Sequence, residues 1–165
     1  TQFPGKGTAR ISITYNTEYI KAYNSDEQLI YKDQFSSDII VLKLFPSLNE
    51  SYIRHVLSIP GLKGVILESY GSGNAPTDKW FLDCLREAIE KGMIIYNVSQ
   101  LIGGVVAHGR YETSKYLEEI GVISGRDITR EAAITKLMFL LGNETNIVDI
   151  KRKLLVPLSG ELTYL

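Results

Sequence analysis

The residues with the clearest potential for ligand chemistry lie in the segment "GVILESYGSGNAPTDKWF", residues 64–81. An apolar run stops there at a glycine-rich turn, in which Gly71 and Gly73 would let a ligand approach the backbone closely. The helix expected to follow would offer free N–H groups to an anion or a carboxylate. Ser69 and Asn74 are the polar side chains placed to bind such a ligand. A tight strand-to-helix turn that holds no ligand explains the same pattern, so both interpretations stay open.

A nucleotide is not the ligand that this turn favours. The dinucleotide fingerprint G-x-G-x-x-G needs a third glycine, and Pro76 stands at that position. The next apolar run ends in Asn97, Ser99 and Gln100, none of which is a carboxylate that could bind a ribose.

A second polar loop follows that apolar run, in "NVSQLIGGVVAHGRYETS", residues 97–114. Ser99 and Gln100 lie at the expected strand end, and the glycines that follow them make the loop more flexible. His108 and Tyr111 could serve as acid–base groups there. For a lone histidine in a loop, a plain surface position is the simpler explanation.

The chain contains no pattern of residues that would form a complete catalytic centre. The motifs G-x-S-x-G, H-E-x-x-H and the Walker loop are all missing. Cys84 is the only cysteine, which excludes an internal disulfide and a four-cysteine zinc site, and it lies on the apolar face of an expected helix. We therefore expect no catalytic residue, metal or cofactor in this chain. It is either a binding module or part of an enzyme whose catalytic groups lie elsewhere.

Composition supports a single ordinary domain and gives little reason to expect a charged partner. The 165 residues carry a formal net charge of −1, so electrostatics makes no case for nucleic acid or an anionic membrane. No apolar run reaches the roughly 20 residues needed to span a bilayer, and no signal-peptide pattern follows the first residues. The first residue is Thr1 rather than Met, which indicates processing or a piece of a longer protein. The single cysteine favours a reducing compartment, and we expect a cytoplasmic protein.

The elements that must position these loops alternate along the chain. Strand-length apolar runs occupy residues 38–45, 62–69 and 93–99, and helical patterns occupy 47–58, 77–92, 112–121, 129–142 and 146–155. Strands this uniformly apolar are covered on both faces, which indicates a small three-layer α/β domain with a parallel, flavodoxin-like or Rossmann-like sheet. Such sheets bind ligands beyond the carboxyl ends of their strands, here at residues 68–76 and 99–111. We expect this domain to span residues 37–165, with residues 1–36 forming a linker and edge strands.

Four blocks of the sequence resemble one known family. The blocks "GVILESYGSGNAP", "NVSQ", "GVISGRDITREAAITKLMFLLG" and "LSGELT" together look like the C-terminal domain of a type I, cytosolic-type bacterial L-asparaginase. That family hydrolyses L-asparagine to L-aspartate and ammonia without a metal or cofactor. Its threonine nucleophile sits in an N-terminal domain, in motifs T-G-G-T and H-G-T-D-T, and neither motif occurs here. The resemblance thus implies an asparaginase domain that is inactive by itself.

The resemblance also implies roles for particular residues. The family forms dimers, or dimers of dimers, in which this domain completes a neighbouring active site, and Asn74 and Tyr111 match the contributing positions. Some members bind asparagine as an allosteric effector at the strand ends, here Glu68, Ser69, Ser99 and Gln100. Those members carry a basic residue at the position of Glu68, which would instead repel the carboxylate of asparagine.

Two alternatives remain beside this interpretation. One is a free-standing module that binds an amino acid or a nucleotide. The other is the related domain of an archaeal amidotransferase that acts on glutamyl-tRNA.

Overall fold

The computed structural model describes residues 31–107 and 112–163, and side chains from 115 onward in the second range. Four parallel strands pair in the order β1, β2, β3, β4. The strands are β1 (Ile39–Lys43), β2 (Gly64–Ser69), β3 (Ile94–Ser99) and β4 (Ile123–Ser124). The helices are α1 (Glu50–Leu57), α2 (Lys79–Glu90), α3 (Glu112–Glu119), α4 (Arg130–Asn143) and α5 (Ile147–Leu154). The predicted three-layer α/β fold with a parallel sheet is confirmed.

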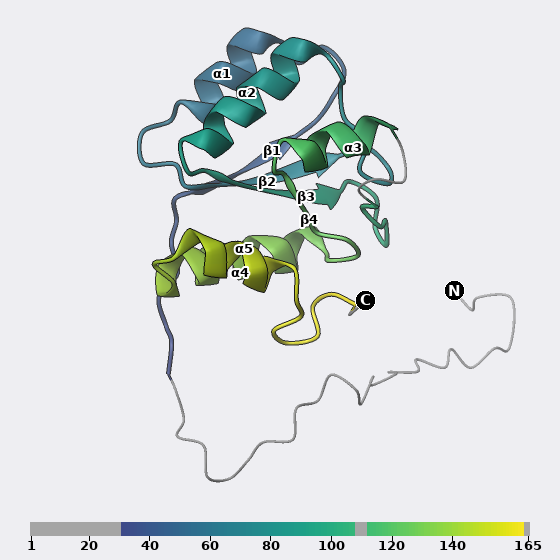
Figure 1. Ribbon diagram of the computed structural model, residues 1–165. Coiled ribbons are helices and arrows are strands. Elements are labelled where there is room, and N and C mark those ends of the chain that lie inside the picture. Colours follow the sequence, from purple (N-terminus) through teal and green to yellow (C-terminus); the bar gives the residue numbers. More distant parts are fainter. Residues whose placement is uncertain (1–30, 108–111, 164–165) are drawn as a thin grey trace, which may run out of the picture.

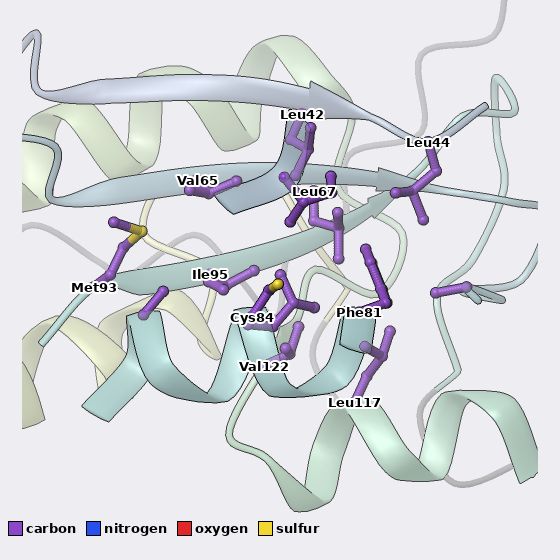
Figure 2. Packing of buried hydrophobic residues seen from close by; sticks show 14 residues of the cluster. Leu42, Leu44, Val65, Leu67, Phe81, Cys84, Met93, Ile95, Leu117 and Val122 are labelled. Atoms are coloured by element: carbon purple, nitrogen blue, oxygen red, sulfur yellow. The ribbon is translucent and has the colours of Figure 1, made fainter. Parts of the chain in front are cut away.

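The helices cover both faces of the sheet, which explains why its strands are apolar throughout. Helices α1 and α2 lie on one face and α4 and α5 on the other (Figure 1). All six residues of the central strand β2 are buried. On the side of α1, α2 and α3, Phe81 and Leu117 pack in one core with strand residues such as Leu67 (Figure 2). Cys84 belongs to this core, as predicted, and its burial raises the pKa of the thiol.

Local signals set the helix ends. Thr129 caps α4 by accepting a hydrogen bond from the backbone N–H of Ala132, and Asn146 caps α5 in the same way. Gly92 takes a φ of 94° just beyond α2, the left-handed conformation that favours glycine after a helix. Helix α2 begins at Lys79 with Asp78 as its N-cap, not at the predicted Thr77. The non-helical backbone of Asp78 sets that boundary, and its carbonyl accepts the first helical bonds, from the N–H groups of Phe81 and Leu82.

The segment before β1 contains no strand from residue 31 onward; instead it lies along α4. The backbone N–H of Ser36 donates to Met138, and the Phe35 ring lies 5.8 Å from that of Phe139. The edge strands predicted within residues 1–30 lie outside the described residues. Strand β4 was not predicted, because two residues are too few to give a pattern of their own.

Acid should weaken the contact between this segment and the end of α4. Glu144 lies 2.6 Å from Lys153 and 2.8 Å from Lys32, and bonds from both ammonium groups lower its pKa to about 2 from an ordinary 4.5. The folded-state pKa is depressed, so the stabilisation is present above pH 4.5 and is lost as pH falls toward 2.

We expect the melting temperature of Glu144→Gln to lie below that of the parent at about pH 6 and to approach it near pH 2. Thermal melts of both proteins across this range test the expectation. Glu90→Gln is the control, because Glu90 lies on α2, away from this contact. A gap that stays constant with pH would contradict the assignment.

Candidate functional site

Both predicted loops lie at the carboxyl ends of neighbouring strands and are hydrogen-bonded to each other. The backbone N–H of Ala107 donates to the carbonyl of Ser72 at 3.0 Å, and the Ser99 hydroxyl donates to the carbonyl of Gly71 at 2.6 Å. Gly73 has a φ of 105°, and a Cβ added there would lie 2.8 Å from Cγ1 of Val106. Only glycine therefore allows the two loops to come this close.

Asn74 closes the turn that follows β2. Its backbone N–H donates to the carbonyl of Tyr70 at 2.9 Å, and its carbonyl accepts from the N–H of Tyr70 at 2.8 Å. The half-buried side chain thus sits on a fixed turn beside the loop that leads to residue 107. Tyr111 and His108, the other residues proposed for this region, lie outside the described residues.

Three of the four residues predicted for an effector site line one cavity. It has a volume of about 320 Å³ and lies where β2 and β3 end. Glu68, Ser99 and Gln100 form one wall, and the segments 101–104 and 127–131 form the rest. Ser69, the fourth predicted residue, is fully buried, donates its hydroxyl to the carbonyl of Val98 at 3.3 Å and does not line the cavity.

Two of these polar side chains hold the backbone in place. Gln100 donates its amide Nε2 to the carbonyls of Leu44 and Glu68, at 2.7 and 2.8 Å, and so ties the ends of β1 and β2 together. The Ser99 hydroxyl also accepts from the backbone N–H of Leu101 at 3.0 Å. These bonds fix the shape of the wall, which leaves the charged groups to determine what the cavity attracts.

Sequence reasoning did not identify the opposite wall, which comes from the start of α4. Arg130 places its guanidinium Nη1 3.4 Å from Oε1 of Glu68, which is only 3% exposed. Asp127 also lines this wall and accepts hydrogen bonds from the backbone N–H and hydroxyl of Thr163. The one available signal was Thr129, an N-cap residue directly after "GVISGRDI", which marks a third loop at the same sheet edge.

The charge at the start of α2 disfavours a phosphate-bearing ligand. Asp78 places a carboxylate at the start of α2, where a phosphate would have to bind. Within residues 31–107 and 112–163, no three His, Cys, Asp or Glu side chains converge in a way that could hold a metal ion. In the same residues, no helix is long and apolar enough to cross a membrane.

Comparison with known proteins gives a consistent result. Residues 38–154 match the family model of the glutaminase/asparaginase C-terminal domain. L-asparaginase 1 of Escherichia coli is 38% identical over 142 residues, which are 86% of this chain and 42% of that protein. The human 60 kDa lysophospholipase is 36% identical over 157 residues, which are 94% of this chain and 27% of that protein.

Two further matches complete the comparison. A glutamyl-tRNA(Gln) amidotransferase component of Sulfolobus acidocaldarius is 33% identical over 132 residues, which are 80% of this chain and 29% of that protein. The crystal structure of L-asparaginase I from Vibrio cholerae superposes with a TM-score of 0.73 at 37% identity, over 78% of this chain and 39% of that chain. This chain thus spans less than half the length of these relatives.

Proposed function

Because this chain belongs to the glutaminase/asparaginase C-terminal domain family, we propose that it is the C-terminal part of a cytoplasmic amidohydrolase that converts L-asparagine to L-aspartate and ammonia. The observation that carries the proposal is the family match over residues 38–154, which include both strand-end loops and the cavity at the ends of β2 and β3. The likeness to L-asparaginase 1 and L-asparaginase I supports asparagine as the substrate. In this proposal the threonine nucleophile lies in a preceding catalytic domain.

The test is ammonia release from L-asparagine by the full-length protein and by the 165-residue chain alone. We expect turnover by the full-length protein and none by the chain, whose sequence has neither T-G-G-T nor H-G-T-D-T. L-glutamine and a lysophospholipid are assayed in parallel, the latter because one relative is named a lysophospholipase. A full-length protein that releases no ammonia from asparagine would overturn the proposal.

A second candidate function is that of an amidotransferase component acting on glutamyl-tRNA. The observation that favours it is the 33% identity to part of such an enzyme. Conversion of glutamyl-tRNA to glutaminyl-tRNA by the full-length protein, in place of free asparagine hydrolysis, would support this alternative. A third outcome, tight binding of a small ligand with neither activity, would support a free-standing binding module.

Within the first proposal, Asn74 contributes to the active site of a neighbouring protomer in a dimer. Its fixed turn and its position beside the second loop support this role. We expect Asn74→Ala to lower kcat/KM of the full-length enzyme about 10- to 100-fold, because a polar contact of roughly 1.4–3 kcal/mol would be lost. Steady-state kinetics measure the effect.

Asn49→Ala is the matched control for this variant. The Asn49 side chain caps α1 by accepting from the backbone N–H of Tyr52, so its loss should reduce stability by about 1 kcal/mol. This bond involves neither loop, so kcat/KM should stay unchanged. Mixed dimers of the Asn74 variant with a nucleophile-deficient protomer test the sharing between protomers. Recovered activity supports a shared site, whereas unchanged kcat and KM in Asn74→Ala would remove Asn74 from the site.

A further inference from the structure

The cavity at the ends of β2 and β3 has a buried carboxylate in its wall. Glu68 is only 3% exposed, yet it borders a space of about 320 Å³ that is large enough for a small ligand. Burial of a carboxylate costs free energy unless a cation or several hydrogen bonds compensate the charge. The compensation around Glu68 therefore indicates which ligand chemistry the cavity favours.

That compensation is incomplete, because Arg130 is bound more closely to another acid. Its Nη1 lies 3.4 Å from Glu68, whereas its Nη2 and Nε lie 2.6 and 3.1 Å from Oε1 of Glu131. The arginine side chain is half exposed, so solvent weakens its attraction to Glu68 further. Over the described ranges, no other cationic side chain pairs with Glu68.

The charged side chains that line the cavity are mostly acidic. Glu68, Asp127 and Glu131 are acidic, and Arg130 is the one basic side chain among the described residues that line the cavity. Asp127 accepts hydrogen bonds from Thr163, and Glu131 is paired with Arg130. The carboxylate of Glu68 is therefore the group that can form a further ion pair with a ligand in the cavity.

We propose that this cavity binds small molecules through a primary ammonium group, which pairs with Glu68 while Arg130 remains with Glu131. A charge-assisted N–H···O bond in a buried setting would supply what the long contact to Arg130 does not. Glu68 then determines specificity by selecting for an amine, and a free carboxylate on the ligand is not required. Amine binding by the cavity does not depend on the proposed function. A regulatory role for that binding rests on the proposed function.

Fragments of one molecule separate the contributions of the two charged groups. L-asparagine carries both an ammonium and a carboxylate, 3-aminopropanamide lacks the α-carboxylate, and succinamic acid lacks the amine. Calorimetric titration of each into the 165-residue chain gives its Kd. We expect 3-aminopropanamide to bind at least as tightly as L-asparagine, because Glu68 repels the α-carboxylate of asparagine. Succinamic acid should bind at least about tenfold more weakly than 3-aminopropanamide.

Two variants on opposite sides of the ion pair should change affinity in opposite directions. Glu68→Gln keeps the shape of the side chain and should weaken 3-aminopropanamide binding about tenfold or more. Arg130→Gln removes the competing guanidinium and should strengthen it. Glu90→Gln, which changes a carboxylate on α2, is the control and should have no effect. The opposite signs distinguish a specific contact from damage to the fold.

Preferential binding of succinamic acid, or equal 3-aminopropanamide binding by the parent and Glu68→Gln, would overturn the inference. Because binding is measured on the chain alone, the result is independent of catalysis. If amines bind but the full-length protein does not hydrolyse asparagine, only the proposed function fails. If hydrolysis is found without amine selection, only this inference fails.

Discussion

Replacing Lys136 with methionine is expected to lower the free energy of unfolding by about 3–5 kcal/mol, because it leaves the mostly buried carboxylate of Glu161 without its cation. The side chain of Lys136 is 3% exposed, and its Nζ lies 2.6 Å from Oε1 of Glu161. Nζ also donates to the carbonyls of Leu154 and Val156, at 3.2 and 2.7 Å. The same lysine thus caps the carbonyl end of α5 and holds the C-terminal segment against α4.

The shifts in pKa agree with this arrangement. Burial lowers the pKa of Lys136, and the bond to Glu161 offsets part of that effect. Burial alone would raise the pKa of Glu161, but bonds from Lys136 and from the backbone N–H groups of Leu158 and Ser159 lower it overall. Each of the two side chains therefore stabilises the charged form of the other. Removal of one should lower the free energy of unfolding more than removal of both.

Urea denaturation measures the effect on the 165-residue chain. The double variant Lys136→Met/Glu161→Gln should recover much of the lost stability, since no buried charge is left unpaired. Lys79→Met is the matched control, because Lys79 is 89% exposed in its own ion pair and should change the unfolding free energy by less than about 1 kcal/mol. A double variant as unstable as Lys136→Met would show that packing, not charge, explains the loss.

The Gly73→Ala variant is expected to have the second largest effect, about 2–5 kcal/mol, and to act directly on the candidate site. Part of the cost is backbone strain, because an L-residue at a φ of 105° is disfavoured by about 1–2 kcal/mol. The rest is overpacking, because the new Cβ would lie 2.8 Å from Cγ1 of Val106, at a cost of about 1–3 kcal/mol. To relieve the contact, the loops that carry Asn74 and residues 99–107 must move apart.

Gly92→Ala separates these two contributions. Gly92 has a φ of 94°, but nothing lies within 4 Å of an added Cβ, so only strain should appear. Urea denaturation of both variants gives the two costs. Amide chemical shifts near Ser99 and Val106 should change in Gly73→Ala and remain constant in Gly92→Ala. Equal destabilisation by both variants, with no shift changes in the loops, would contradict the close approach of the two loops.

The sequence alone predicted much of the fold, because the signals involved are local. Apolar runs and helical periodicity located β1, β2 and β3 and the helices around them. The cap residues Thr129 and Gly92 marked helix ends through bonds to their own neighbours. The core position of Cys84 followed from the helical spacing of its apolar neighbours. Each of these features depends on residues a few positions apart, which is the range over which sequence patterns carry information.

The sequence also located both loops of the candidate site and the position of Glu68, but not the partner of Glu68. Arg130 lies 62 positions further along the chain, and Lys136 and Glu161 meet only because α5 turns back across α4. Strand β4 brings the start of α4 to the same sheet edge, although its two residues gave no recognisable pattern. Contacts of this kind depend on how the whole chain packs, and no local spacing encodes them. Local sequence therefore determined where the candidate site lies, and the tertiary structure decided which charges meet there.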